Sequence, residues 1–514
     1  MNFSVKIRNI ILTAFVFALL LPVLAFGSVH SLVIYHTNDV HGYMFEARDG
    51  NGKLTNIGYD RLKAVVDADP SPCKLLLDAG DVLHGQSFAT SKRGELAALL
   101  LSLAGFDALA TGNHDFDYGQ ERLLELVEKY RLNFLAANVV KKTGGYILPP
   151  YMVRSWSDLK VGVFGLSTPE TRTTTAPGNI EGLEIEDPIE VSRKMVSLLK
   201  SEGADLIIAV MHMGSEAYCD PSSLTIAKEV PGLDIIIDGH SHSVLTKHAA
   251  RSDGSVALVA SAGASFKNLG KVMIDRKPGG EFIITAQMLP ASSPEIEAVT
   301  PDPAMNSAMT ALKTEFDKEM SVVVMKSPLN LDGARERVRS GSTNMGRVIC
   351  AALVDVTGAD AAIMNGGSVR DSIPAGDVTK GELLSVLPYG NYIYTINISG
   401  EDLLDALNHG LSEIGNGAFP QFWGMEVTVH PEKNGFAAES MTIGGKPLDP
   451  NGTYTLAIND FLHSGGDGYE MFKKYDYREY ETLEEAFRKF ITGKDAQTLE
   501  AISNTEVLKI MQNH

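Results

Sequence analysis

Five short apolar runs in this chain are each followed, within a few residues, by a side chain that can bind a metal. The runs cover residues 32–35, 75–77, 108–110, 206–211 and 234–237. The side chains that follow them are Asp39, His41, Asp81, Asn113, His212, His240 and His242. Short apolar runs bounded by Gly and Asp predict strands that are buried on both faces. Because sites in open α/β sheets lie at the carboxyl ends of strands, we expect these side chains to meet.

The seven side chains form a donor set for divalent metal ions. Asp, His and Asn supply mixed oxygen and nitrogen ligands, and Asp81 is the carboxylate that can bridge two ions. A single pair such as Gly80-Asp81 would mean little, because buried, hydrogen-bonded His and Asp residues are common. Their repetition after successive strands predicts a two-metal site that hydrolyses a phosphate ester.

The length and composition indicate a two-domain globular protein. A chain of 514 residues is too long for one hydrophobic core, and its 44% hydrophobic and 21% charged residues are ordinary globular values. The net charge of −19 excludes the basic footprint that polymeric nucleic acid requires. The three cysteines, Cys73, Cys219 and Cys350, do not make a disulfide framework, so we expect buried thiols, with one bridge left open.

Residues 1–27 read as a secretory signal peptide. Lys6 and Arg8 precede an uncharged apolar stretch that ends near the small residues around position 25. A membrane anchor is the alternative, but Pro22 and the short apolar run disfavour it. We therefore expect a periplasmic or secreted protein that has no membrane attachment after cleavage, and we expect it to be a monomer.

The second half begins after a predicted linker helix at 301–324, where Pro301 and Pro303 precede a run of helix formers. A second helix is predicted to start at Thr343, with one apolar face made of Met345, Val348, Ile349, Ala352, Leu353 and Val356. A strand at 360–364 and a turn at 365–370 follow.

Three groups of residues in this half are suited to a nucleotide. Arg335, Arg339 and Arg370 can make bidentate phosphate contacts. Tyr389 and Phe461 can stack on a base. The residues that can hydrogen-bond ribose or base are Asn365, Asn391 and Asp467. The alternative is that the arginines are solvated on loops and the aromatic rings belong to the core.

The first half resembles the calcineurin-like metallophosphoesterases through the blocks D-x-H, G-D, G-N-H-D, H and G-H-x-H. The resemblance implies that one ion is held by Asp39, His41, Asp81 and His242, and the other by Asp81, Asn113, His212 and His240. It also implies that His114, paired with Asp117, stabilises the transition state or assists the leaving group. The best-known periplasmic relatives have Gln where this chain has His242, so the ions stay open among Zn, Mn, Co and Mg.

The second half resembles the C-terminal domain of the 5′-nucleotidases at residues 335–339, 343–346, 365–371, 387–391 and 465–469. Over the whole chain the similarity is to the secreted bacterial 5′-nucleotidase/UDP-sugar hydrolase family. There the positions of Tyr389, which is usually Phe, and Phe461 stack the base, and the arginines hold phosphates. The implied α/β architecture is a four-layer α/β/β/α catalytic domain at 28–300, a linker helix at 301–324 and a smaller substrate-binding domain at 325–514.

These observations predict a metal-dependent 5′-nucleotidase, which hydrolyses nucleoside 5′-monophosphates to nucleoside and phosphate for extracytoplasmic salvage. The nearest alternative is a 2′,3′-cyclic-nucleotide phosphodiesterase with 3′-nucleotidase activity. UDP-sugars or dinucleotides are a further substrate class for the same site. A nucleotide-binding protein without catalytic activity is disfavoured, because the full ligand set, His114 and Asp117 are all present.

Overall fold

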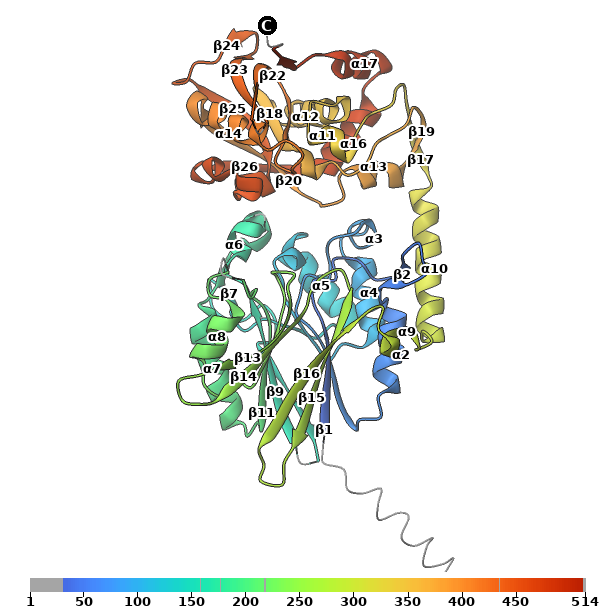
Figure 1. Ribbon diagram of the computed structural model, residues 1–514, viewed down its shortest axis with the longest axis vertical. Helices are drawn as coiled ribbons and strands as arrows, with labels where there is room; N and C mark the ends of the chain where they lie inside the picture. Colours follow the sequence, from blue (N-terminus) through green and yellow to red (C-terminus); the bar gives the residue numbers. More distant parts are fainter. Residues whose placement is uncertain (1–30, 158, 176, 217–218, 434, 512–514) are drawn as a thin grey trace, which may run out of the picture.

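The computed structural model describes residues 31–511 except 158, 176, 217–218 and 434. The predicted signal peptide at 1–27 lies outside the described residues. The first half of the chain contains two six-stranded sheets that pack face to face (Figure 1). The first sheet has the order β16-β15-β1-β4-β5-β6, in which β1, β4, β5 and β6 run parallel. Its strands are β1 (Ser31–Thr37), β4 (Cys73–Asp78), β5 (Ala108–Ala110), β6 (Phe134–Leu135), β15 (Asn268–Arg276) and β16 (Phe282–Pro290).

The second sheet has the order β13-β14-β12-β11-β9-β8. Its strands are β8 (Tyr151–Trp156), β9 (Leu159–Ser167), β11 (Leu206–His212), β12 (Ile235–Asp238), β13 (Val244–Ala250) and β14 (Val256–Ala262). Alternation along β1 shows how the layers form: Leu32 and Ile34 face the second sheet, whereas Val33 and Tyr35 belong to the core under the helices. Both faces of β1 are therefore buried, as its apolar sequence predicts.

Helices cover the outer face of each sheet and complete the four predicted layers (Figure 1). Those packed on the first sheet are α2 (Tyr59–Ala68), α4 (Glu95–Ala104) and α5 (Gln120–Tyr130). Those packed on the second are α7 (Pro188–Ser201) and α8 (Ser223–Glu229). The start of α7 is fixed locally, because the Asp187 side chain accepts from the N–H groups of Ile189 and Glu190.

Shorter elements connect these layers. They are β2 (Ala47–Arg48), β3 (Leu54–Asn56), α3 (Ser87–Thr90), η1 (His114–Phe116), β7 (Val139–Lys141), α6 (Thr171–Thr174), η2 (Pro177–Ile180), β10 (Leu183–Ile185) and α9 (Pro294–Glu297). The long helix α10 (Pro303–Met320) then runs along the side of the first half and reaches the second (Figure 1). Its N-terminus is capped by Asp302, which accepts from the Met305 N–H.

The second half contains a five-stranded sheet with the order β21-β18-β25-β20-β26. Its strands are β18 (Ala361–Asn365), β20 (Tyr392–Ser399), β21 (Pro420–Trp423), β25 (Thr453–Asn459) and β26 (Tyr477–Thr482). One face packs on α12 (Asn344–Thr357), α13 (Lys380–Val386), α16 (Leu483–Gly493) and α17 (Ala496–Asn504). The other packs on α14 (Gly400–Ser412) and a four-stranded sheet of β22 (Met425–Glu432), β23 (Gly435–Ile443), β24 (Lys446–Pro447) and β27 (Leu508–Ile510).

The remaining elements of this half are β17 (Val323–Ser327), β19 (Gly376–Thr379), α11 (Arg335–Val338), η3 (Gly366–Ser368), α15 (Asp460–His463), η4 (Gly466–Gly468) and η5 (Glu470–Lys474). Helix α12 begins where the sequence predicts, because the Thr343 hydroxyl accepts from the Gly346 N–H. One member of its predicted apolar face is wrong: Val356 is exposed, because it lies in the last turn, beyond the layer that buries Met345 to Leu353.

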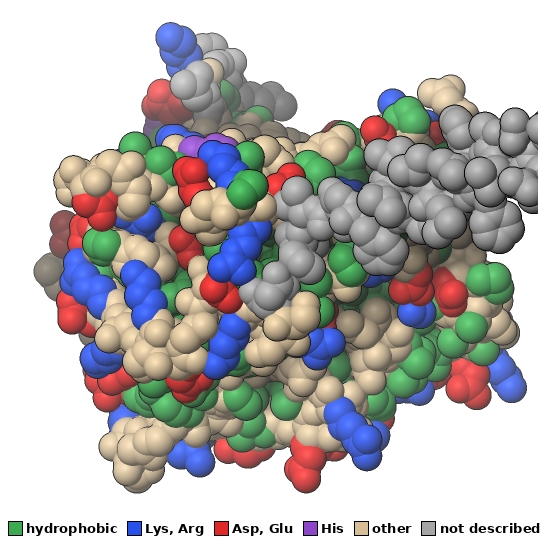
Figure 2. Space-filling view, turned by 90° about the horizontal axis from the view of Figure 1, so that it is seen from below, with side chains coloured by type: hydrophobic (Ala, Val, Ile, Leu, Met, Phe, Trp, Pro, Cys, Tyr) green, Lys and Arg blue, Asp and Glu red, His purple; other side chains and the backbone are tan. Residues whose placement is uncertain are grey.

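The surface agrees with the charge analysis. Figure 2 shows the face of the first half that points away from the second half, and Lys, Arg, Asp and Glu side chains are interspersed across it. Cys73, Cys219 and Cys350 are buried thiols, as expected. Within the part of the chain that the structure describes, no helix is both long enough and apolar enough to cross a membrane.

Candidate metal centre and substrate site

The carboxyl ends of β1, β4, β5, β11 and β12 converge at one edge of the two packed sheets. The loops that leave these strands carry the seven predicted metal-binding side chains, Asp39, His41, Asp81, Asn113, His212, His240 and His242. Two groups of three side chains place their ligand atoms within 4.8 Å of one another, namely Asp39, His41 and His242, and Asp39, Asp81 and His212. The expected convergence of strand ends is thus present in the fold.

Distances in this cluster centre on the carboxylates of Asp39 and Asp81. Asp81 Oδ2 lies 3.1 Å from His212 Nε2 and 3.7 Å from His41 Nε2. Asp39 Oδ1 lies 3.5 Å from His242 Nε2 and 4.0 Å from His41 Nε2. Asp81 therefore stands between the histidines of both predicted ligand sets, where a bridging carboxylate is needed.

Asn113 and His240 border the same cluster. The Asn113 Oδ1 atom is buried without a hydrogen-bond partner in the described structure. The His240 ring lies 5.1 Å from the His212 ring, centroid to centroid, and its Nε2 atom is 2.8 Å from Glu170 Oε2. Glu170 thus engages Nε2, which leaves Nδ1 as the ring nitrogen for a metal, the usual pattern of a ligand histidine held by a carboxylate.

The electrostatics of the cluster fit divalent cations. Burial raises the pKa of the Asp39 carboxyl. Burial acts the same way at Asp81, but the imidazoles of His212 and His114 outweigh it and hold the pKa of this carboxyl well below its usual range. His212 Nδ1 lies 2.7 Å from the Ala79 carbonyl oxygen, which leaves its buried Nε2 for the cluster. A cation would interact favourably with these buried carboxylates and with the buried Asn113 Oδ1 atom, which has no hydrogen-bond partner among the described residues.

Backbone strain concentrates at the same residues. Ten described non-glycine residues have a positive φ, and five of them are predicted ligands: Asp39, His41, Asp81, His240 and His242. Such conformations are sparsely populated and persist where the surroundings enforce them. Gly112 is required for packing, because a Cβ there would lie 2.1 Å from Asp81 Oδ1. The strained loops therefore hold the predicted ligand side chains in the metal-binding cluster.

Buried polar side chains brace these loops. The Asp115 carboxylate accepts from the N–H groups of Asp81, Val82, Leu83 and Gly112, which joins two of the loops. Asp238 accepts from the N–H groups of Met213 and Gly214 beyond β11. Fixed loops of this kind pre-organise a metal site and reduce the ordering that binding would require.

His114 and Asp117 form a pair beside the cluster. His114 Nδ1 lies 2.7 Å from Asp117 Oδ2, and the His114 N–H donates to Asp81 Oδ1 at 2.9 Å. Burial alone would lower the pKa of His114, but Asp117 and Asp81 outweigh it and raise that pKa to about 10. A cationic imidazole held in this position can stabilise negative charge or protonate a leaving oxygen.

A cavity of about 110 Å³ connects this pair to the second half of the chain. Its lining includes His114 and Asp117 from the first half, and Tyr389, Asn391 and Phe461 from the second. Tyr389 is 45% exposed and Phe461 is 40% exposed, so neither ring is a core residue. The aromatic rings predicted to hold a base and the predicted catalytic pair therefore face one space.

The other predicted substrate residues gather next to Tyr389. The Arg370 guanidinium lies 5.7 Å from the centre of the Tyr389 ring. Burial and the nearby Arg335 and Arg370 lower the pKa of Arg339, and the Arg339 Nε atom is buried without a partner in the described structure. An anion would relieve the repulsion among these three arginines.

Asn365 braces this region. Its Nδ2 donates to Asp467 Oδ2 at 2.8 Å, and its Oδ1 accepts from the Ser368 hydroxyl and the Asn459 amide. The amide is thus engaged within the protein, and Asp467, at a positive φ of 52°, is the group that it orients. Asn391 is likewise held, since its Nδ2 donates to Asp460 Oδ1 at 2.8 Å.

Comparisons with known proteins agree with this geometry. Residues 32–244 match the calcineurin-like phosphoesterase family, and residues 322–474 match the 5′-nucleotidase C-terminal domain. The chain is 31% identical over 481 residues to a 5′-nucleotidase of Vibrio cholerae, with 86% of each chain covered. The chain belongs to the 5′-nucleotidase family. The prediction of the family, of the two-domain α/β fold and of a phosphoric monoester hydrolase is confirmed.

Two further proteins are similar to this member of the 5′-nucleotidase family. The solved structure of a 5′-nucleotidase precursor from Thermus thermophilus matches with a TM-score of 0.65 and 26% identity, covering 94% of this chain and all of that one. The trifunctional nucleotide phosphoesterase YfkN of Bacillus subtilis is 30% identical over 511 residues. The match covers 89% of this chain but only 34% of YfkN, so this chain spans about a third of that relative.

Sequence reasoning missed several residues of the site in this family member. Glu170 follows the carboxyl end of β9 at the same sheet edge. A search for polar side chains after every predicted strand would therefore have identified it. His84 lies three residues after Asp81, and its Nδ1 is 3.3 Å from Asp117 Oδ2. Tyr394, Thr175 and Asp460 also line the cavity, but no local pattern in the sequence marks them.

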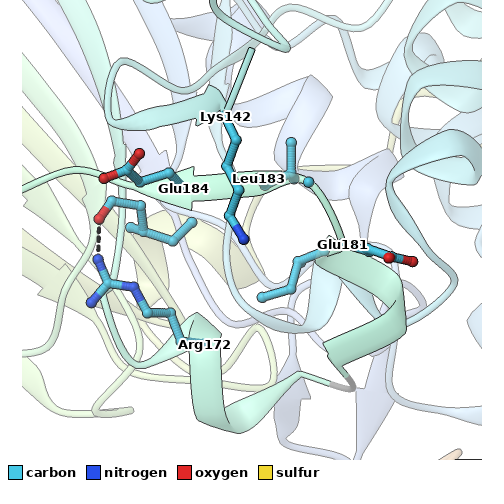
Figure 3. A pocket seen from close by; sticks show the side chains of 8 residues that line it. Lys142, Arg172, Glu181, Leu183 and Glu184 are labelled. Carbon is cyan, nitrogen blue, oxygen red and sulfur yellow. Dashed lines mark hydrogen bonds between the residues drawn. The ribbon is translucent and has the colours of Figure 1, made fainter. Parts of the chain in front are cut away.

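A wider cavity of about 630 Å³ lies elsewhere on the first half (Figure 3). Lys142, Arg172, Glu181 and Glu184 line it, and Arg172 donates to the Ile185 carbonyl oxygen. None of the predicted site residues lines this cavity, and its charges are mixed. Size therefore does not identify the site, and we assign the chemistry to the smaller cavity beside His114.

Proposed function

We propose that this protein hydrolyses nucleoside 5′-monophosphates to nucleoside and phosphate, with two divalent metal ions. The observation that carries the proposal is the 110 Å³ cavity lined by His114 and Asp117 from one half and by Tyr389, Asn391 and Phe461 from the other. A nucleotide has a phosphate at one end and an aromatic base at the other. The cavity offers matching groups for both ends.

We assign the metal ligands as the family resemblance implies. One ion would be held by Asp39, His41, Asp81 and His242, and the other by Asp81, Asn113, His212 and His240. The donor set of carboxylate, amide and imidazole suits Zn, Mn, Co or Mg, and the third imidazole, His242, bears on the choice. When bound, such ions lower the pKa of a water and neutralise phosphate oxygens.

The chain's own residues supply the remaining chemistry. Asp117 orients the His114 ring through Nδ1, so Nε2 is the nitrogen that meets developing charge on the phosphate or the leaving 5′-oxygen. Arg335, Arg339 and Arg370 attract the anionic substrate. Tyr389 and Phe461 hold the base, and Asp467, braced by Asn365, is placed to bind a sugar hydroxyl.

The same proposal includes the setting in which the enzyme acts. The predicted signal peptide supports a periplasmic or secreted protein that salvages extracytoplasmic nucleotides, and we propose that it acts as a monomer. Its substrates would be small nucleotides, because the net charge of −19 disfavours nucleic acid polymers. Phosphate release from AMP, 3′-AMP, cyclic 2′,3′-AMP and UDP-glucose separates the alternatives, and we expect AMP to be preferred over 3′-AMP and the cyclic nucleotide.

Replacing Phe461 by alanine tests nucleoside recognition. Stacking contributes about 1–3 kcal/mol per base, so Phe461→Ala is expected to raise the KM for AMP by about tenfold or more. Hydrolysis of p-nitrophenyl phosphate, which has no base, should change much less. Steady-state kinetics with both substrates measure the difference.

Tyr146→Ala is the matched control, because it removes a ring of 45% exposure from the first half, away from the 110 Å³ cavity. Equal losses with both substrates in Phe461→Ala would show that the ring has a structural role. An unchanged KM for AMP would place the base elsewhere.

A further inference from the structure

The two halves of the chain meet at the loop that carries Asp117. The Tyr392 hydroxyl, at the start of β20, donates to the Asp117 main-chain carbonyl oxygen at 2.6 Å. The Asn179 amide donates to the same carbonyl at 2.9 Å and also hydrogen-bonds to Tyr392. The main chain of Asp117 is therefore held by one group from each half.

A second contact lies beside the first. A Cβ at Gly390, which has a φ of +68°, would lie 2.5 Å from His84 Nε2. The main chain at Gly390 thus sits directly on the His84 ring. His84 in turn stacks on His114, with 5.6 Å between ring centroids and 14° between planes. The segment that enters β20 therefore contacts Asp117 directly, through Tyr392, and reaches His114 indirectly, through His84.

Tyr392 is also tied to the predicted base site. The Asp460 carboxyl accepts from the Tyr392 main-chain N–H, from the Asn391 amide and from the Phe461 N–H. Asp460 is half-buried, and these hydrogen bonds fix Tyr392 relative to Phe461. A continuous set of hydrogen bonds runs from Phe461 through Asp460 and Tyr392 to Asp117.

We propose that Tyr392 is a positioning residue, whose hydroxyl couples docking of the second half to the orientation of the His114–Asp117 pair. The inference rests on the proposed function, which assigns that pair to catalysis. Undocking of the second half would leave the Asp117 carbonyl with Asn179 alone and would uncover His84. The catalytic pair is then fully held only when the residues that bind the nucleoside are in place.

The variant Tyr392→Phe tests the proposal, because it keeps the ring and removes only the hydroxyl. The kcat is expected to fall by about 3- to 10-fold for both AMP and p-nitrophenyl phosphate, the size of one lost hydrogen bond. The KM for AMP should stay within about twofold, since the hydroxyl contacts Asp117 and not the substrate. Metal content and Tm should match the wild type.

Tyr454→Phe is the control. It removes a hydroxyl that accepts from the Asp449 N–H, on the strand that pairs with β20 but away from the first half. It should leave the kinetics of both substrates unchanged. A KM effect confined to AMP in Tyr392→Phe would overturn the proposal, because it would make Tyr392 a substrate-binding residue.

A double-mutant cycle shows whether Tyr392 acts through Asp117. In an Asp117→Ala background, adding Tyr392→Phe should lower kcat no further, since the side chain that it positions is gone. A full additional loss would contradict the proposal. If the wild-type protein cleaves p-nitrophenyl phosphate but not AMP, the 5′-nucleotidase assignment fails, whereas the role of Tyr392 is still decided by p-nitrophenyl phosphate.

Discussion

Asp81→Asn is expected to abolish measurable turnover, a loss of about 10³-fold or more, while the fold is retained. The His114 N–H donates to Asp81 Oδ1, so an asparagine would keep its amide oxygen on that side. Its NH₂ group would then face His41 and His212, and an NH₂ group cannot bind a cation. The bridging charge and one ligand atom are lost together.

The measurement for Asp81→Asn combines kcat with metal content and Tm. Asp253→Asn makes the same chemical change in an exposed turn, where Asp253 accepts from Ser255, and should leave turnover unchanged. Near-wild-type turnover by Asp81→Asn with both metals bound would contradict the bridging assignment.

His114→Ala is expected to lower kcat by about 10²–10⁴-fold, the usual size of an acid–base or electrostatic contribution. The metal content should be intact, because His114 is engaged with Asp117 and lies beside the predicted ligands without being one. Single-turnover kinetics and metal analysis of the same preparation give both numbers.

His248→Ala provides the comparison, since that histidine is exposed and contacts only the Ile284 carbonyl oxygen among the hydrogen bonds that the structure describes. Its kcat and its metal content should equal those of the wild type. Loss of bound metal in His114→Ala would mean that His114 is itself a ligand, and the division of roles between Asn113 and His114 would be wrong.

The part of the fold that local patterns encode was predictable. Apolar runs such as 75–77 and 206–211 became buried strands, and Thr343 caps α12 as its sequence predicts. The loops after these strands carry the candidate ligands because parallel strands bring their carboxyl ends to one edge. For Tyr389 and Phe461, the pattern left a core role open, and only their exposure beside the cavity favours the other role.

What the sequence did not reveal depends on contacts between distant segments. Tyr392 meets Asp117 across 275 positions, and no periodicity marks such a pair. His84 lies next to the Asp117 carboxylate only in the folded chain, where Gly390 of the other half covers the His84 ring. Val356 continued the apolar pattern of α12, but the layer that buries this helix ends before it.

The most direct test is a crystal structure of the protein with Mn²⁺ and a non-hydrolysable nucleotide analogue, with anomalous diffraction used to locate the metal. We predict two ions about 3.5–4 Å apart, both bound by Asp81, and a base between Tyr389 and Phe461. A single ion held by Glu170, Cys219 and His240, whose ligand atoms also lie within 4.8 Å of one another, would contradict the two-metal account.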